Sequence, residues 1–458
     1  MRKLQRKRHL ILYALSGMGV NMLNLMVGSY LCSAVLVGGF GENAVAHQTF
    51  AQRDLVIAGV WSVFVLLAKI IDGVIDVPMA SFTDRLRTRW GRRRPSLIIG
   101  FVPMVLFYLL FSVAPVQTGA TLLNTIFFGV VLCGFYSFYT LTMVTYYATF
   151  TEIVDTPHER SLLANVKSVC DIVYFILGYV VVRMLLNGLN IRVVALLVLP
   201  LSLTMLIPLF LIKEPSTRVQ DSGAVSQPKT VNLIQSLKLT FRNRSFLLWM
   251  AVYSFMTFGV QLFLGGINEY FSFVGMSMIF VMMAAFAPVP LTLVLYNRIL
   301  RKRGFGFAFR YALLTYAVGM LSMFAVGLMP SGMVKTVLSV ATGLLSSLSI
   351  GALFAVAYSV PAQLAADEEK ATGVSHSAMY FAVQGLFSGV ATGIGTGIVL
   401  VALKGSEESS SGAIRFMTLI SAIGVLLAFF LTFTLKKSLL NLGKESGSKP
   451  SRLPQKKA

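Results

Sequence analysis

The chain has 458 residues, of which 56% are hydrophobic and 12% are charged, whereas an ordinary soluble domain is roughly 25% charged. A water-soluble protein of this length needs more polar surface than these residues supply, which excludes a soluble enzyme, a secreted protein and a disordered scaffold. In so apolar a chain, the net charge of +21 is typical of basic cytoplasmic loops rather than of nucleic-acid binding. We therefore expect an all-α integral membrane protein.

Twelve apolar runs are each long enough to cross a bilayer as a helix, which takes about 20 residues. Lysine and arginine gather before the first run, between the second and third, between the eighth and ninth, and after the twelfth. Such residues favour the cytoplasmic side, so both termini are predicted to be cytoplasmic. The runs are residues 10–37, 55–82, 96–113, 121–149, 162–185, 193–212, 246–269, 276–295, 309–328, 334–360, 376–401 and 416–435.

The longest polar connection divides the twelve spans into six and six. It begins with proline, serine and glycine, and it continues with interleaved apolar and basic residues typical of an amphipathic helix at the membrane interface. Two halves of six spans are the layout of a large class of secondary transporters, whose substrate site lies at the midplane. We expect an N-terminal bundle over residues 1–213, a cytoplasmic linker over 214–245, a C-terminal bundle over 246–436 and a basic cytoplasmic tail over 437–458.

The second span carries three ionisable residues, Lys69, Asp72 and Asp76. Their spacings of three and four place them on one helix face. Each costs at least about 2.5–3.5 kcal/mol inside a membrane, which makes such residues candidates for function. Lys69 neutralises one carboxylate, and the surplus negative charge suits a proton or Na⁺ at Asp72 and Asp76. The alternative is a salt-bridged helix interface without a ligand.

Other polar residues inside the spans are candidates for substrate contact or for charge pairing. The fourth span is rich in tyrosine and threonine, which could bind a sugar through hydroxyl groups and ring faces. Amides in the first and eleventh spans are candidates too, with interhelical hydrogen bonding as the alternative. Asp171 lies four residues after Lys167, as a structural pair or as a site residue, and Glu152 belongs to a charge network at the end of the fourth span. The substrate candidates are Asn21, Tyr139, Thr142, Tyr146 and Gln384.

No catalytic site is expected. The four histidines lack metal-ligand spacing, the three cysteines lie within apolar runs, and no P-loop for ATP is present. We expect neither an enzyme nor a cofactor, and no metal beyond a possible Na⁺ at the two aspartates.

Three segments resemble the glycoside–pentoside–hexuronide:cation symporter family, a branch of the major facilitator superfamily. They are DGVIDVPMASFTDRLRTRWGRRRP at residues 72–95, TEIVDTPHERSLL at 151–163 and NRSFLLW at 243–249. The resemblance implies a major facilitator fold and binding of the coupling cation by Asp72 and Asp76. It also implies sugar-site positions at Asn21, Thr142, Tyr146 and Lys167.

Two departures from the family pattern affect which ion is coupled and which sugar is bound. Ile75 stands where sodium-using members have asparagine, which favours a proton over Na⁺. The family's sugar-binding acids and its eleventh-helix lysine are replaced, the latter at about Gly389, so melibiose itself is not implied. Charge partners and gating residues are expected in the second span, in the loop after it and near the fourth and fifth spans: Lys69, Asp84, Arg85, Arg92, Arg93, Arg94, Glu152 and Asp171.

The function we expect is symport of a sugar or glycoside with a proton or Na⁺, by alternating access, in the plasma membrane. We expect a monomer in the lipid bilayer with a small-molecule substrate and no nucleic acid. The alternatives are a symporter of a lysophospholipid or other amphiphile on the same fold, and a membrane sensor without transport.

Overall fold

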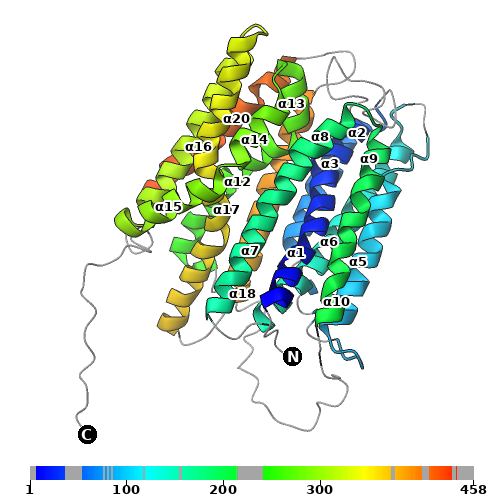
Figure 1. The fold of residues 1–458 in the computed structure, drawn as a ribbon, viewed down its shortest axis with the longest axis vertical. Coiled ribbons are helices and arrows are strands. Elements are labelled where there is room, and N and C mark those ends of the chain that lie inside the picture. Colours follow the sequence, from blue (N-terminus) through cyan, green and yellow to red (C-terminus); the bar gives the residue numbers. More distant parts are fainter. Residues whose placement is uncertain are drawn as a thin grey trace.

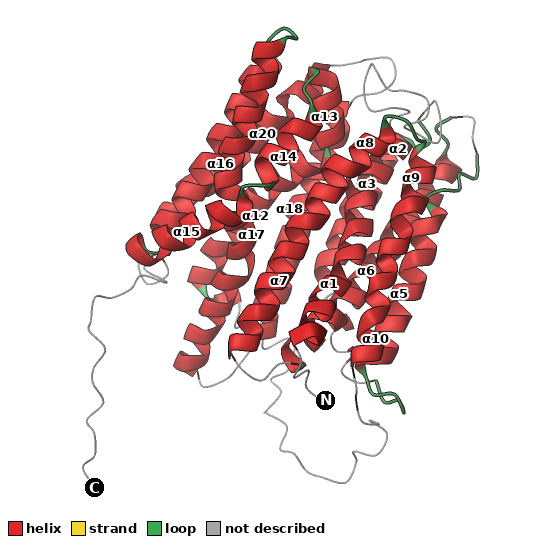
Figure 2. Cartoon of the chain, viewed as in Figure 1, coloured by secondary structure: helices red, strands yellow, loops and turns green. Residues whose placement is uncertain are grey.

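A computed structural model describes residues 7–36, 54–75, 78–79, 82–83, 86–116, 119–153, 157–212, 214, 241–372, 377–404, 412–435 and 440. Long helices run side by side through most of this part of the chain (Figure 1). The described residues contain no strand (Figure 2). The predicted linker falls largely outside the described residues, as does nearly all of the predicted tail.

The described residues of the first half form six helical columns. Side-chain caps start two of them: Thr121 accepts a hydrogen bond from the backbone of Asn124, and Asn190 from that of Arg192, because the first N–H groups of a helix need external partners. The elements are α1 (Lys7–Leu25) continuing through η1 (Met26–Leu31) into α2 (Cys32–Leu36); α3 (Ala58–Val74); α5 (Arg93–Leu110); α6 (Leu122–Glu152); α7 (Pro157–Ile176) continuing through η3 (Leu177–Val181) into α8 (Val182–Leu186); and α9 (Ile191–Val198) continuing through η4 (Leu199–Leu206) into α10 (Ile207–Leu211).

The second half forms a comparable group of helices. Asn243 caps the first of them by accepting hydrogen bonds from the backbone of Ser245 and Phe246. The elements are α12 (Arg244–Gly265), α13 (Ile267–Val274), α14 (Met278–Phe286), α15 (Val289–Arg303), α16 (Phe305–Gly327), α17 (Met333–Thr372), α18 (Ser377–Gly393) continuing through η6 (Ile394–Val399) into α19 (Leu400–Lys404), η7 (Gly412–Phe416), α20 (Met417–Leu431) and η8 (Thr432–Thr434).

Eleven helical segments of the described residues are long and apolar enough to cross a membrane. They match eleven of the twelve predicted runs, which confirms the all-α membrane fold. The remaining run, residues 55–82, contains α3, which is 17 residues long. The count of twelve spans and the side of the membrane on which the termini lie stay predictions.

The two halves meet most extensively where α3 packs against α18 and η6. Glycines recur every four residues along α18 and η6. A Cβ added at one of them, Gly389, would lie 2.4 Å from the carbonyl oxygen of Lys69 on α3. Gly393 and Gly397 approach α3 in the same way, at Leu66 and at the backbone of Ser62. Small residues allow helix backbones to come this close inside a membrane.

Several columns change their helical geometry partway along. Three of them contain π-helical turns, η1, η3 and η6, and Gly266 separates α12 from α13. These interruptions meet in pairs: the Tyr30 hydroxyl of η1 donates to the Gly178 carbonyl of η3 at 2.7 Å, and Gly265, next to the break at Gly266, lies against Thr396 of η6. Irregular turns of this kind are common at functional sites in helices.

Candidate transport cavity

A cavity of about 210 Å³ lies between the two halves. Its walls come from α1, η1, α2, α3, α6, α7 and η3 of the first half, and from α12, α18, η6 and α19 of the second. This volume is below the roughly 300–1,000 Å³ of drug-sized ligand sites, so it suits a small solute. The polar residues in the walls are Asn21, Asn24, Ser29, Ser33, Lys69, Tyr136, Tyr174, Tyr179, Gln261, Thr392, Thr396 and Lys404.

Lys69 connects the cavity to the predicted cation site. Its ammonium nitrogen lies 3.8 Å from the ring centroid of Tyr136, and both residues line the cavity. Asp72, one helical turn further along α3, does not line it. Instead, Asp72 accepts a hydrogen bond of 2.6 Å from the Thr140 hydroxyl on α6. Asp76, the second carboxylate of the predicted cation site, lies outside the described residues.

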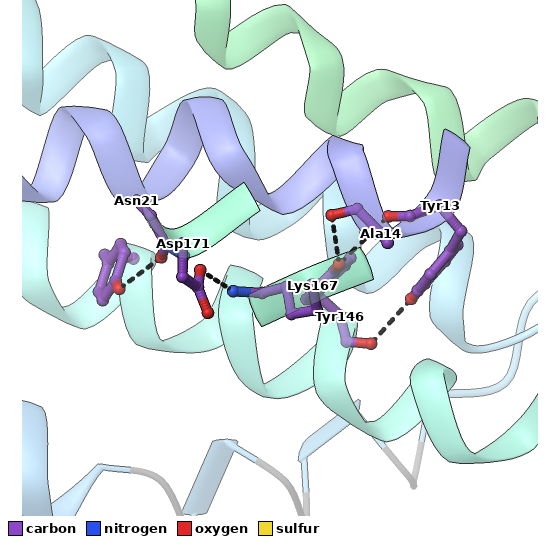
Figure 3. Close-up of polar contacts among 7 residues, drawn as sticks. Tyr13, Ala14, Asn21, Tyr146, Lys167 and Asp171 are labelled. Atoms are coloured by element: carbon purple, nitrogen blue, oxygen red, sulfur yellow. Dashed lines mark hydrogen bonds and ion pairs between the residues drawn. The ribbon is translucent and has the colours of Figure 1, made fainter. Parts of the chain in front are cut away.

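Asn21 and Tyr139, two of the predicted substrate contacts, are hydrogen-bonded to each other, but of the two it is Asn21 that lines the cavity. The Tyr139 hydroxyl donates to the Asn21 side-chain oxygen at 3.1 Å, and Asn21 lines the cavity. Figure 3 shows Asp171 beside Asn21, with Lys167 one turn away on the same helix. Lys167 and Asp171 form the ion pair that their spacing predicts, and Lys167 is buried. Neither of these two lines the cavity.

Tyr146 is packed away from the cavity. Its hydroxyl donates to the carbonyl oxygens of Tyr13 and Ala14, while the Tyr13 hydroxyl donates to the carbonyl oxygen of Tyr146 at 2.7 Å (Figure 3). The two rings are stacked with centroids 5.0 Å apart. This reciprocal pair ties α1 to α6, and it leaves Tyr146 no surface for a substrate in this conformation.

Thr142, another of the predicted substrate contacts, does not line the cavity either. Its hydroxyl donates to the backbone of Phe138. Its other neighbour is Gly100 of α5, where an added Cβ would lie 2.5 Å from the Thr142 hydroxyl oxygen. Thr142 therefore packs α6 against α5 and does not reach the cavity.

Gln384 is buried behind the cavity wall rather than in it. The indole N–H of Trp249 donates to the Gln384 side-chain oxygen at 2.9 Å, which joins α12 to α18. Two other amides, Asn24 and Gln261, line the cavity together with Asn21.

Polar and aromatic contacts join the halves at the end of the cavity away from the start of α1 (Figure 1). Asn268 donates to the carbonyl oxygen of Ser29 at 2.6 Å, and Arg183 donates to the Ser272 hydroxyl at 2.9 Å. The ring centroids of Phe175 and Phe286 are 5.0 Å apart. These contacts link α7 and α8 and the η1 turn with α13 and α14, so this end of the cavity is closed between the halves.

Lys404 and Glu269 form a second charged pair at this closed end. The ammonium nitrogen of Lys404 lies 2.9 Å from a carboxylate oxygen of Glu269 and donates to the Ser33 hydroxyl at 2.8 Å. The sequence analysis missed Lys404, because the predicted eleventh span ended at residue 401 and left this lysine in the following loop. That span stays helical to Lys404, which places this lysine in the cavity wall instead.

The loop arginines bind within the first half. The backbone N–H of Arg93 donates to the Glu214 carboxylate at 2.8 Å, and its guanidinium donates to Thr83 at 3.3 Å. The Arg94 guanidinium donates to the carbonyl oxygen of Leu209, and the backbone oxygen of Arg92 accepts from Ser96. In this conformation, these contacts hold the start of α5 to the end of α10. Asp84, Arg85 and the side chain of Glu152 lie outside the described residues.

The fold is that of the major facilitator transporters. It is similar to the xylose transporter XylE from E. coli in a partially occluded inward open conformation, with a TM-score of 0.61 and 13% identity over 94% of this chain and 98% of that one. It is also similar to the nucleoside transporter NupG, with a TM-score of 0.58 and 14% identity over the same shares. A bacterial homologue of the human lysosomal transporter Spinster, inward-facing and unoccupied, has a TM-score of 0.59 and 13% identity, again over 94% of this chain and 98% of that one.

A family model described as MFS/sugar transport protein matches residues 12–436. The chain therefore belongs to the MFS/sugar transport protein family, as the sequence motifs indicated, and it is a multi-pass membrane transporter rather than an enzyme.

Two curated relatives match a smaller part of the chain. A lactose permease of Lactobacillus helveticus is 24% identical over 166 residues, which are 35% of this chain and 25% of that protein. The uncharacterized symporter sll1374 of Synechocystis sp. (strain ATCC 27184 / PCC 6803 / Kazusa) is 28% identical over 128 residues, which are 27% of this chain and 24% of that protein. The matched segments thus span about a quarter of each relative's length.

Proposed function

We propose that the chain is a cation-coupled symporter of a sugar or glycoside, working by alternating access in the plasma membrane with both termini in the cytoplasm. The observation that carries this proposal is the position of Lys69. Its ammonium group lines the cavity, and it lies one helical turn from Asp72, which is held by Thr140 at 2.6 Å. A change of charge at Asp72 is therefore felt by a group that faces the substrate.

The coupling follows from electrostatics in a medium of low dielectric constant. When Asp72 is ionised, it attracts the Lys69 ammonium along α3. When a cation neutralises Asp72, this attraction is lost and the ammonium group is free to contact a solute in the cavity beside the ring of Tyr136. The binding free energy of the substrate then depends on whether the cation is bound, and the reverse holds equally. This mutual dependence is the thermodynamic requirement for coupling. The family membership and the symporter among the relatives support this proposal.

A proton is the coupling ion that we favour. Na⁺ prefers several oxygen ligands, and Ile75 supplies none from its side chain. A proton requires only one carboxylate that can be neutralised, and Asp72 with its single Thr140 hydrogen bond meets that requirement. Asp76 is the second carboxylate of this proposed site.

Uptake into proteoliposomes tests the function. Labelled neutral and acidic sugars and glycosides are offered with an imposed pH gradient, an Na⁺ gradient or neither. Concentrative uptake of a sugar driven by the pH gradient is expected, and Asp72→Asn should abolish it while leaving exchange of substrate down its own gradient.

Asp54→Asn, the same substitution just before the start of α3, is the matched control and should retain accumulation. Full accumulation by both Asp72→Asn and Asp76→Asn would remove these carboxylates from the mechanism. A strict requirement for Na⁺ would overturn the preference for a proton.

A further inference from the structure

The charged groups that face the cavity are both positive. Among the residues described, Lys69 of α3 and Lys404 of α19 line it, and no aspartate or glutamate does. Their carboxylate partners lie behind them, Asp72 against α6 and Glu269 on α13. A solute in the cavity therefore meets two ammonium groups in a medium of low dielectric constant, where such contacts are strong.

Lys404 is built as a binding group. Its side chain is only 4% exposed, and a lysine is rarely buried to this degree unless it is paired. The ammonium group carries three donors, of which one goes to the hydroxyl of Ser33 in the opposite half. A second donor faces Glu269, whose carboxylate oxygen lies 2.9 Å away. Lys404 thus retains donor capacity toward the cavity.

We propose that the substrate carries an anionic group, a carboxylate or a phosphate, and that Lys404 binds this group with help from Ser33. The proposal rests on the sugar-transport function above and defines its substrate as an anionic sugar derivative. The neutral amides Asn24 and Gln261, which line the same cavity, bind the hydroxyl groups of the ring. Hydrogen bonds between ionised partners are about twice as strong as neutral ones, so the anionic group dominates recognition.

Glu269 is the partner of Lys404 in the empty cavity. An anionic substrate competes with Glu269 for the same ammonium group, and Arg183 lies on the other side of the closed end, bound to Ser272. Because Lys404 also binds Ser33 across the two halves, occupation of Lys404 by the substrate acts directly on the contact that closes this end. Lys404 therefore both recognises the anion and takes part in the contact between the two halves.

Equilibrium binding to the purified full-length protein in lipid nanodiscs tests the proposal. Three probes share one ring skeleton: glucose, glucuronate and glucose 6-phosphate. We expect at least one of the two anions to bind about tenfold or more tightly than glucose, the gain from one hydrogen bond to a charged group. The two anions distinguish a carboxylate from a phosphate.

Variants of Lys404 and Glu269 test whether this pair causes the preference for an anion over glucose. Glu269→Gln removes the competing carboxylate and should tighten binding of the preferred anion. Lys404→Gln combined with Glu269→Gln leaves no unpaired buried charge, and it should abolish the preference while retaining binding of glucose. Lys302→Gln, at an exposed position near the end of α15, is the control for loss of one lysine and should behave as the parent protein.

The outcomes separate this proposal from the function on which it rests. Binding of glucose as tightly as both anions, or an anion preference that survives in the double variant, overturns the assignment to Lys404 and leaves sugar transport standing. Failure of all three probes to bind, together with failure of every sugar in the uptake panel, overturns both.

Discussion

Gly73 of α3 and Gly385 of α18 approach so closely that a Cβ added to Gly73 would lie 2.3 Å from the carbonyl oxygen of Gly385. This contact belongs to the glycine-lined seam between the two halves, in which α3 packs against α18 and η6 and Gly389 approaches Lys69. The halves of a transporter that works by alternating access must move against each other, so this seam either slides or serves as a pivot.

Gly73→Ala should disturb the seam. Overpacking of this kind costs about 1–3 kcal/mol, and we expect reduced thermal stability together with slower transport. The control is Gly59→Ala on the same helix, where an added Cβ meets nothing within 4 Å. Both variants share the gain in helix propensity, so the difference between them measures the contact. Thermal unfolding and uptake rates that match in the two variants would refute the importance of the seam.

Thr140→Val should change the affinity for the coupling cation. The lost hydrogen bond joins a hydroxyl to the Asp72 carboxylate at 2.6 Å, and bonds to charged groups are worth about 1.5–3 kcal/mol. Without this donor, the carboxylate holds a proton more tightly, so half-maximal uptake should occur at about tenfold lower proton concentration.

Weaker cation binding in Thr140→Val would instead indicate that the coupling ion is Na⁺. If Thr140 instead supplied an oxygen ligand to Na⁺, its loss would weaken cation binding. Thr142→Val is the control on the same helix, because that hydroxyl donates to its own backbone and faces α5. Initial uptake rates measured against pH, and separately against Na⁺ concentration, separate the two cases.

Tyr139→Phe and Tyr146→Phe should have different effects. The hydroxyl of Tyr139 binds Asn21 at the cavity, so its removal should raise the KM for substrate and leave thermal stability nearly unchanged. The hydroxyl of Tyr146 binds the backbone of α1, so its removal should cost about 1 kcal/mol of stability with little effect on KM. A raised KM in Tyr146→Phe alone would restore that residue to the substrate site.

The orientation in the membrane can be tested at two similarly exposed positions. Val113 follows α5 at one end of the bundle and is 55% exposed, while Trp90 precedes α5 at the other end and is 53% exposed. After replacement of the three native cysteines, a membrane-impermeant maleimide applied to intact cells should label Val113→Cys and not Trp90→Cys. Labelling with the opposite preference would invert the topology.

Hydropathy and charge were sufficient to predict the fold because they report directly on the solvent around each segment. Runs of about 20 apolar residues become helices in lipid, where every backbone polar group must be bonded internally. The ends of the spans were less certain. The segment that includes Lys404 stays helical three residues beyond the predicted end, and that error concealed a charged residue of the cavity wall.

The orientation of side chains on α6 shows a second limit. Tyr139 and Tyr146 are seven residues apart, nearly two turns of helix, and both face α1. Thr142 comes three residues after Tyr139, which rotates it by about 60° around a helix of 3.6 residues per turn. This rotation is enough to turn Thr142 from α1 toward α5. Sequence spacing limits a residue to a broad face, while the neighbouring helix decides which part of that face borders the cavity.

Lys69 and Asp72 illustrate the same limit for charged residues. Their spacing predicts one face, and a structure was needed to show that the lysine borders the cavity while the carboxylate binds α6. Ion pairing within one helix, by contrast, depends only on local spacing, and the predicted pair of Lys167 and Asp171 is present.

The π-helical turns and the break at Gly266 divide four columns of the cavity wall at a common depth. Tyr30 of η1 reaches Gly178 of η3, and Gly265 and Gly266 lie against Thr396 and Leu400 of the neighbouring column. A helix bends most readily where its regular hydrogen-bond ladder is interrupted. The short helices that follow these breaks, α2, α8, α13 and α19, can therefore tilt while the longer helices before the breaks stay packed. Opening the end of the cavity closed by Asn268 and Arg183 then involves these short segments, whereas the opposite end is bordered by the longer ones, so the two ends open by different motions.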